Sequence, residues 1–286
     1  MSERNPIIAP VLSPKSILSK PSLSINDTPL RRFFVLATLR LLNRILPRHG
    51  PVLMLSKSLC IKLGTLKLPA EAATMQLIAK HTLIPVPRVY CAFERKGCKY
   101  ILMERVQGHI LRENWLERSA ESKEKVLAQI KNMVDQMRQI PCPSGQGISN
   151  VAGRPLFDGR LPGGSYHGPF DTVLDFHKYL REGYEGGNSN VPEANRLVER
   201  HNQSSSKPIF THGDLNTMNI IVRGDEVVGI IDWETAGWWP EYWEYTSAWH
   251  VNPYDEFWRA EVDKFLEPRE EELEMERVRR KYFKAF

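Results

Sequence analysis

Three polar residues in the segment 210–234 (FTHGDLNTMNIIVRGDEVVGIIDWE) have types and spacing that suit a site for magnesium and phosphate. Asp214 follows a predicted short strand, while Asn219 and Asp232 stand at the two ends of a predicted hairpin. Because a hairpin folds the chain back on itself, we expect these three side chains to lie close together. Mg²⁺ prefers hard oxygen ligands and is held by a few protein groups together with phosphates. A carboxylate that does not bind the ion can orient an attacking hydroxyl group and accept its proton.

The elements predicted around this segment form a strand-rich first part and a mostly helical second part. We expect short strands within 52–63, 89–93, 100–106, 209–211, 219–222 and 227–231, and helices over 69–81, 119–140, 171–182, 192–202, 241–250 and 255–284. The stretch 141–170 holds seven glycines and five prolines, and long loops of this kind in compact domains are often functional. This order favours a two-lobed α+β protein with a cleft between the lobes.

The N-terminal region combines a polar tail with a basic amphipathic helix. Residues 1–29 hold six serines and five prolines, a composition typical of a disordered tail. Thr28 and Pro29 have the types of a helix N-cap and first turn, and apolar residues recur among four arginines over 30–46. We expect this apolar stripe to pack on the domain that follows, and weak contact with a membrane surface is the alternative.

Composition excludes several classes of protein. The chain has 286 residues, of which 42% are hydrophobic and 26% charged, so whole-chain disorder and low-complexity classes are excluded. No stretch approaches the apolar length that a transmembrane helix needs, and the four cysteines have neither zinc-site nor disulfide-framework spacing. No nucleic-acid recognition motif accompanies the basic residues. We expect a monomeric globular protein that does not bind nucleic acid.

The spacing His-x-Asp-x-x-x-x-Asn in HGDLNTMN, followed by IIDWE after a strand, resembles the aminoglycoside phosphotransferase family of kinase-like small-molecule phosphotransferases, in particular a fungal branch of it. The resemblance covers 30–265 and implies a bilobal, protein-kinase-like α+β fold. It implies a small strand-rich N-lobe over 30–106, on the nucleotide side, and a larger, mainly helical C-lobe over 107–286. It also implies ATP and Mg²⁺ as cofactors and the transfer of a phosphoryl group to a hydroxyl group of a small molecule.

The resemblance assigns roles to the residues that match the family's motifs. Asp214 is expected to be the catalytic base, and Asn219 and Asp232 are expected to hold the magnesium ions. Lys62, in CIKLG, stands where such kinases keep the lysine that grips the α- and β-phosphates. Glu71, in PAEAATM, stands where they keep the ion-pair partner of that lysine.

Further roles follow from the same resemblance. The segment MERV after the strand YIL resembles the hinge between lobes, where the carbonyl of Glu104 and the amide of Val106 would meet the adenine edge. His212 is expected to be a structural residue that braces the catalytic loop. Glu244 is expected to support the same loop.

The segment 235–249 (TAGWWPEYWEYTSAW) is rich in aromatic residues. Core packing is the first interpretation for most of these rings, because Trp and Tyr dominate burial where helices dock. The alternative is a wall or cation cage for the acceptor. Trp238 and Glu241 are the candidates for contact with the acceptor.

Two residues favour a small-molecule acceptor over a protein substrate. Gly213 stands where many regulated protein kinases carry arginine, and Asn216 stands where Ser/Thr kinases carry lysine, so a protein kinase is disfavoured. No GxGxxG pattern precedes Lys62, although protein-kinase phosphate loops use glycine for close backbone approach. A catalytically weak pseudokinase, acting as a nucleotide-binding or scaffold module, therefore remains an alternative.

The formal net charge of +5 is unevenly distributed. Residues 1–70 contain 11 Lys and Arg against two acidic residues, whereas residues 71–286 contain 28 against 32. The basic part suits ATP or an anionic membrane, and the acidic part suits magnesium and a cationic or hydroxylated acceptor. We expect a cytoplasmic protein, and the acid-poor N-terminal region makes a mitochondrial location the alternative.

Overall fold

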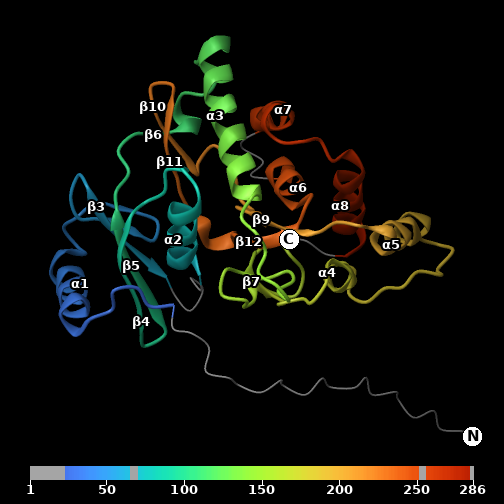
Figure 1. Cartoon of the computed structure of the whole chain (residues 1–286), viewed down its shortest axis with the longest axis horizontal. Helices are drawn as coiled ribbons and strands as arrows, with labels where there is room; N and C mark the ends of the chain where they lie inside the picture. Colours follow the sequence, from blue (N-terminus) through green and yellow to red (C-terminus); the bar gives the residue numbers. More distant parts are fainter. Residues whose placement is uncertain (1–22, 65–69, 251–255, 284–286) are drawn as a thin grey trace, which may run out of the picture.

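The computed structural model describes residues 23–64, 70–250 and 256–283 and has two lobes (Figure 1). In the described part of the N-lobe, five antiparallel strands form one sheet in the order β1-β2-β3-β5-β4. Their bounds are β1 Arg48–His49, β2 Val52–Met54, β3 Leu59–Gly64, β4 Val89–Arg95 and β5 Cys98–Glu104. The strands predicted within 52–63 and on both sides of the turn at 95–97 are confirmed. β1 was not predicted, because two residues are too short for a hydrophobic pattern.

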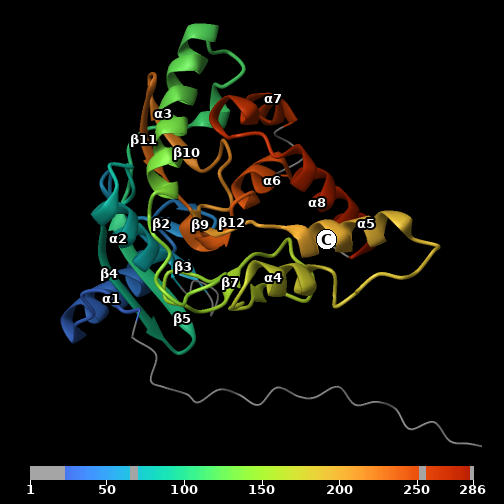
Figure 2. The same ribbon diagram turned by 45° about the vertical axis from the view of Figure 1, so that its right-hand side comes forward.

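Two helices cover opposite faces of this sheet, as both views show (Figures 1 and 2). α1 (Pro29–Leu42) packs on the face that carries Ile61 and Phe93. α2 (Glu71–His81) packs on the other face, where Lys62 lies. Because successive side chains of a strand point to opposite faces, Ile61 and Lys62 are directed to different sides. The sheet therefore stands between α1 and the side on which Lys62 lies.

The last residues of the predicted tail over 1–29 belong to the described fold. The first 22 residues of that tail lie outside the described residues. After them, Ile25 exchanges two backbone hydrogen bonds with Ala92, so the end of the predicted tail joins the sheet. The Thr28 hydroxyl accepts a hydrogen bond from the amide of Arg31, which confirms the predicted N-cap of α1.

The described part of the C-lobe is mainly helical. Its helices are α3 Ala120–Arg138, α4 Val173–Leu180, α5 Pro192–Gln203, α6 Trp243–His250, α7 Glu256–Phe265 and α8 Glu270–Tyr282, with short 3₁₀ turns η1 Leu111–Glu113 and η2 Trp233–Thr235. The single helix predicted over 255–284 is wrong, because Pro268 has no amide hydrogen and lies between α7 and α8. Pro69, the predicted first residue of the helix that became α2, lies outside the described residues. No described helix has the length and hydropathy that crossing a bilayer requires.

Short antiparallel strand pairs lie among these helices. They join β10 Ile220–Arg223 to β11 Glu226–Ile230 and to β6 His109–Ile110, β9 Pro208–Thr211 to β12 Gly237–Pro240, and β7 Leu156–Phe157 to β8 Tyr166–His167. The β10–β11 hairpin matters most for the site, because the amide of Ile231 donates to the carbonyl of Asn219 at 2.9 Å. Asn219 and Asp232 therefore lie at the same end of the hairpin. β12 was not predicted, because the segment 235–249 was interpreted only from its aromatic content.

The long loop 141–170 is folded onto the C-lobe. Ile148 forms a bridge with Phe170, and Ser149 forms a bridge with Trp238 of β12. These pairings fasten both ends of the loop next to the segment that follows Asp232. The middle of the loop, which contains β7 and β8, is thereby held near the site.

Candidate active site

A cleft of about 470 Å³ lies between the two lobes and brings together residues that are far apart in the sequence. Its walls come from the N-lobe sheet, α2, β6 and the β10–β11 hairpin. Among the lining residues are six that the sequence analysis assigned to the site, namely Lys62, Glu71, Glu104, Val106, Asn219 and Asp232. Both lobes therefore contribute to one cavity.

Lys62 is the centre of the ionic contacts in this cleft. Its Nζ donates to Glu71 Oε1 at 2.8 Å and to Asp232 Oδ1 at 2.5 Å. Lys62 is 6% exposed and Glu71 is 2% exposed, so water barely reaches this ion pair. Burial by itself would lower the pKa of Lys62, but the carboxylates of Glu71 and Asp232 outweigh burial and raise that pKa. The ammonium group therefore keeps its charge in the cleft, where it can meet an anionic ligand.

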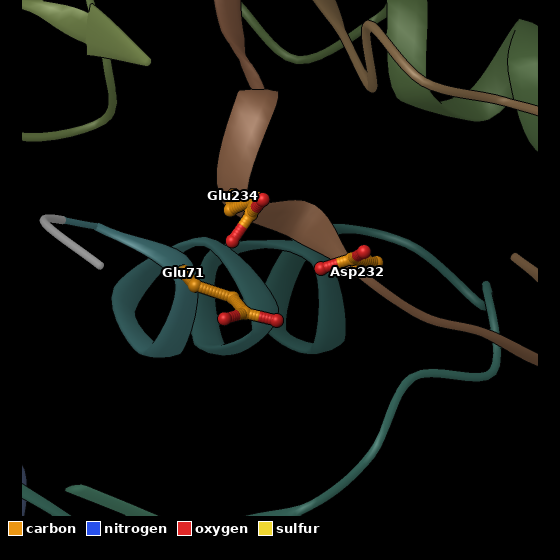
Figure 3. A group of neighbouring side chains, drawn as sticks. All are labelled: Glu71, Asp232 and Glu234. Atoms are coloured by element: carbon orange, nitrogen blue, oxygen red, sulfur yellow. The ribbon is translucent and has the colours of Figure 1, made fainter. Parts of the chain in front are cut away.

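A third carboxylate, Glu234, lies beside Glu71 and Asp232. One oxygen from each of the three lies within 4.8 Å of the others, and Figure 3 shows the three carboxylates turned toward a common space. Burial, followed by the charge of Asp232, raises the pKa of Glu234 to about 7. The sequence analysis quoted Glu234 in the motif IIDWE but gave it no role. The signal was its place two residues after Asp232, in the turn η2.

The predicted hinge lies at the end of β5. Glu104 pairs with Leu59 of β3, and its carbonyl accepts a weak hydrogen bond from Cys60 Sγ at 3.6 Å. Val106 packs against Gly229 of β11, where an added Cβ would lie only 2.9 Å from Val106 Cγ1. A side chain at position 229 would therefore push the hinge away from the C-lobe. In the described part of the chain, no backbone acceptor pairs with the amide of Val106.

The segment that carries Asp214 is held by two buried side chains. Glu244 is 1% exposed, and its carboxylate accepts the amides of His212 at 2.7 Å and Gly213 at 3.1 Å. The His212 ring pairs through Nε2 with the carbonyl of Ile231 at 3.0 Å and through Nδ1 with the amide of Asp214 at 3.2 Å. These partners require a proton on Nε2 and none on Nδ1, and burial lowers the pKa of His212, which keeps the ring neutral. His212 thus joins the backbone before Asp232 to the backbone of Asp214.

Two backbone positions beside the site have a positive φ. Gly213 has φ +78°, and a Cβ there would lie 3.2 Å from the carbonyl oxygen of Thr235. The positive φ and the nearby carbonyl oxygen therefore favour glycine at this position, where many regulated protein kinases carry arginine. Asp232 has φ +64°, a conformation that costs a non-glycine residue free energy and that is concentrated at functional sites.

Asn219 connects Asp214 to the cleft. Its Nδ2 donates to the carbonyl oxygen of Asp214 at 2.8 Å and to Oδ2 of Asp214 at 2.9 Å. Because the amide nitrogen is used toward Asp214, the amide oxygen is left for another partner. Asn219 and Asp232 both line the cleft, and Asp232 presents a carboxylate oxygen close to those of Glu71 and Glu234, so the oxygen donors that Mg²⁺ prefers are gathered here. The residues present therefore fit a magnesium ion.

Arg160, from the long loop 141–170, reaches the other side of Asp214. Its Nη1 lies 3.3 Å from Asp214 Oδ1, and its Nη2 donates to the carbonyl of Gly213. Asp158 fixes the guanidinium, accepting from Nε at 2.8 Å and from Nη2 at 2.7 Å. Burial raises the pKa of Asp214, and the charge of Arg160 opposes that effect. Arg160 therefore favours the ionised form of this carboxylate.

Sequence reasoning missed both Arg160 and Asp158. They stand in DGR within a loop that has no hydrophobic period and no family motif. The length and glycine content of the loop indicated a functional segment, but nothing in its sequence pointed to one arginine.

Comparison with known proteins decides the family. The model of the phosphotransferase enzyme family matches residues 62–279, which is more than half of the chain and includes Lys62, Asn219 and Asp232 of the cleft. The chain belongs to this phosphotransferase family. No curated protein matches its sequence.

Solved structures of aminoglycoside phosphotransferases share the fold of this phosphotransferase. A thermostable mutant of APH(4)-Ia, in a ternary complex with AMP-PNP and hygromycin B, has a TM-score of 0.58 at 14% identity over 88% of each chain. The streptomycin–ATP complex of APH(2")-IIa has a TM-score of 0.56 at 10% identity over 90% of this chain and 88% of its own. APH(3'')-Id from Streptomyces rimosus, with ADP and streptomycin, has a TM-score of 0.51 at 15% identity over 88% of this chain and 99% of its own. The predicted bilobal α+β fold is confirmed.

Two residues predicted to contact the acceptor lie elsewhere in the phosphotransferase. Trp238 is 2% exposed and packs edge-on against Phe210 in the core, so its ring offers no wall to a ligand. Glu241 forms an ion pair with Arg269 at 2.7 Å and lines a separate groove beside α5 and α8. The prediction for Trp238 came from the aromatic content of its segment and that for Glu241 from closeness in sequence, but the pairing of β12 with β9 places both outside the lining of the cleft.

Proposed function

We propose that this phosphotransferase moves the γ-phosphoryl group of ATP to a hydroxyl group of a small molecule, with Asp214 as the catalytic base. The observation that carries the proposal is the position of the Asp214 carboxylate. Asn219 holds it at the edge of the cleft, and Asn219 itself lines that cleft together with Lys62 and Asp232. An acceptor hydroxyl at Asp214 would therefore stand next to phosphates bound at Lys62.

ATP is expected to lie along the cleft. Lys62 is assigned to the α- and β-phosphates, and Glu71 keeps its ammonium group in place through the 2.8 Å ion pair. The carbonyl of Glu104 and the amide of Val106 lie at the hinge, where an adenine edge can pair with backbone groups. Because this pairing uses only backbone atoms, the hinge side chains need no particular chemistry.

Asn219 and Asp232 are the residues that would hold magnesium, with Glu234 as a third oxygen donor. When bound, the ion supplies charge neutralisation to the phosphates. Asp232 also has a partner within the protein, because Lys62 Nζ donates to its Oδ1 at 2.5 Å. Lys62 thus positions one oxygen of Asp232, while the second oxygen remains available in the cleft.

The transfer step is an in-line substitution at phosphorus. The acceptor oxygen forms a bond to the γ-phosphorus while the bond from that phosphorus to the β–γ bridging oxygen breaks, and ADP leaves with the electron pair. The hydroxyl proton passes to the carboxylate of Asp214. His212, Glu244 and Arg160 orient that carboxylate, so most of the catalytic contribution is positioning.

Acceptor specificity is expected to come from the loop 141–170. This loop supplies Arg160 next to Asp214, whereas the aromatic segment 235–249, for which core packing was the first interpretation, is largely buried. The neighbouring solved structures carry aminoglycosides, which makes these compounds one class to test among other small hydroxylated molecules.

A panel of acceptors tests the proposal. Purified protein with MgATP is incubated with aminoglycosides, choline, sugars, amino alcohols and ketosamines, and ADP release is measured. We expect turnover with at least one class, and we expect Asp214→Asn to lower it by about 10³-fold while the MgATP-dependent rise in melting temperature persists. Asp135→Asn, at an exposed position of α3, is the matched control and should leave turnover unchanged. Turnover that survives in Asp214→Asn would reject the mechanism.

A nucleotide-binding module without turnover is the second candidate. The observation that favours it is the β1–β2 turn, in which His49 and Pro51 line the cleft on either side of Gly50. Pro51 has no amide hydrogen to donate to a phosphate, and the turn is short. A MgATP-dependent melting shift that is lost in Asp232→Ala, combined with no turnover on any acceptor, would select this candidate.

The proposal also includes a monomeric enzyme of the cytoplasm, with mitochondria as the alternative. The acid-poor N-terminal region is the basis for the mitochondrial alternative. Deletion of 1–22, which keeps the pairing of Ile25 and the cap of α1, followed by microscopy of the tagged protein, distinguishes these locations, and the mass of the full chain in solution tests the monomer.

A further inference from the structure

The helix α1 has two apolar faces, and one of them points into solvent. On the inner face Val35 is 3% exposed and packs with Ile61, Cys91 and Phe93 of the sheet. The outer face, continued by the turn after the helix, carries large apolar side chains with high exposure: Leu30 65%, Phe33 65%, Phe34 59%, Leu41 70% and Ile45 75%. The sequence analysis expected one stripe that packs on the domain, and the structure divides it into a packed half and an exposed half.

The exposed face belongs to a well-anchored helix rather than to a loose end. The Thr28 hydroxyl caps its first turn, and Arg32 forms an ion pair with Asp27. The guanidinium of Arg32 also lies over the ring of Phe93, 5.7 Å from its centroid. The outer apolar side chains are therefore held in one orientation relative to the sheet.

The outer face is bordered by positive charge. The segment 29–50 contains five arginines and no acidic residue. Within the described residues, neither Arg40 nor Arg44 forms an ion pair, and both belong to the exposed positions. A shallow groove of about 520 Å³ runs along the helix with Arg32, Arg40 and Arg95 around an apolar floor. A single surface therefore offers exposed apolar side chains and unpaired guanidinium groups.

We propose that α1 and the turn that follows it form a docking site for an anionic lipid surface. A helix with an apolar face and flanking arginines lies in the plane of the membrane interface, with its apolar side chains among the acyl chains and its guanidinium groups at the lipid phosphates. Charge complementarity selects this occupant. A second copy docking face to face would bring two sets of arginines together. Residues 1–22 carry three basic residues and one acidic residue, so they do not complement the charge of α1 either.

Docking through α1 leaves the cleft accessible. The N-lobe sheet separates α1 from α2 and from Lys62, and both ribbon views show α1 on the side away from the C-lobe (Figures 1 and 2). The docking site therefore does not depend on the proposed phosphotransfer and can be tested without an acceptor.

Co-sedimentation of the full chain with vesicles tests the proposal. We expect binding to phosphatidylcholine vesicles that contain phosphatidylserine, weak binding to phosphatidylcholine alone, and loss of binding at high salt. Arg40→Glu with Arg44→Glu should weaken binding by about fivefold or more per arginine, since each basic residue near an anionic surface contributes on that order. Phe34→Ser, Leu41→Ser and Ile45→Ser together should weaken it by at least tenfold, because the apolar face contributes the inserted area.

Matched variants elsewhere on the surface keep the test sharp. Leu83 is 91% exposed and Leu116 is 69% exposed, and their replacement by Ser should leave vesicle binding unchanged. Arg196→Glu, on the exposed side of α5, is the control for charge. Unchanged melting temperatures show that the α1 variants remain folded. Equal binding to neutral and anionic vesicles, no vesicle binding at all, or a dimer that the Ser variants dissociate would each overturn the proposal.

Discussion

The proposed nucleotide side and the proposed acceptor side of the site are each organised by a chain of three charges. On the nucleotide side, the buried acid Glu71 holds Lys62, and Lys62 contacts Asp232. Here a buried acid fixes a cation, and the cation positions an aspartate that is partly exposed. The side chain of Asp232 is 39% exposed, so it remains accessible to a ligand.

The acceptor side repeats this arrangement with a different scaffold. Asp158, 1% exposed, holds Arg160, and Arg160 contacts Asp214. The cation here is on an irregular loop and its side chain is 26% exposed, whereas Lys62 is on the central strand β3 and its side chain is 7% exposed. The difference teaches that the cation proposed to contact phosphate is built into the sheet, while the cation proposed to act on the acceptor side belongs to a loop that can vary without changing the sheet.

The comparison predicts that the two cations affect different kinetic constants. We expect Lys62→Ala to raise the KM for ATP and to remove the MgATP-dependent melting shift. Arg160→Ala should lower kcat by about 10²-fold while the KM for ATP and the melting shift stay near those of the wild type, because it acts at Asp214. Steady-state kinetics and thermal melting with MgATP measure both.

Lys131→Ala on α3 and Arg196→Ala on α5 are the matched controls, since both side chains are exposed and far from the cleft. If Arg160→Ala loses nucleotide binding to the same extent as Lys62→Ala, then Arg160 contributes to nucleotide binding and the predicted division of roles is wrong. Rescue of kcat by Arg160→Lys would show that charge rather than bidentate geometry is required.

The buried acids should differ in their contribution to stability. Asp158 accepts three hydrogen bonds from Arg160, whereas within the described residues Glu71 accepts a single side-chain hydrogen bond, from Lys62. We expect Asp158→Asn to lower the free energy of unfolding by on the order of 3 kcal/mol and Glu71→Gln to lower it by about 1 kcal/mol. Urea unfolding measures both values. A larger loss in Glu71→Gln would contradict the comparison.

The same two acids should respond to acid with opposite signs. Burial alone would raise the pKa of Asp158, but Arg160 lowers it below its ordinary value of 3.8, so ionised Asp158 stabilises the fold. This contribution is fully present above 3.8 and is lost as pH falls through the folded pKa, so the difference from Asp158→Asn shrinks only there. Burial raises the pKa of Glu71 despite Lys62, so ionising this carboxyl costs more in the folded chain than in the unfolded chain.

Acidification should therefore improve the wild type relative to Glu71→Gln, as pH falls through the raised folded pKa of Glu71. We expect this pH-dependent change in the difference between wild type and variant to be smaller than the free-energy differences at neutral pH. Unfolding free energies measured from neutral to acidic pH give the two difference curves. Curves that bend in the same direction would show that burial affects both acids alike.

Much of the fold and part of the site could be predicted from sequence. The helix α3 was predictable because Val126, Ile130 and Val134 recur at helical spacing, and the structure buries all three. The β10–β11 hairpin was predictable because two apolar runs flank the turn at 223–226. Local patterns of this kind depend only on neighbours in the chain.

Other features needed contacts across long sequence separations. The contact between Arg160 and Asp214 joins positions 54 residues apart through a loop without periodicity. The aromatic residue Trp238 could be a core residue or a ligand contact, and only the pairing of β12 with β9 decided that it is buried. Glu241 was assigned by closeness in sequence, but strand geometry separated it from Asp232.

The sequence by itself determined which residue types stand at Lys62, Asp214, Asn219 and Asp232, and the order in which they follow one another. It also determined the amphipathic pattern of α1. The tertiary structure alone decided that Asp158 and Arg160 lie beside Asp214 and that half of the apolar stripe of α1 faces solvent. The physical reason is that hydrogen bonding and periodicity within one element are local, whereas burial and charge pairing depend on which distant segments the folded chain brings together.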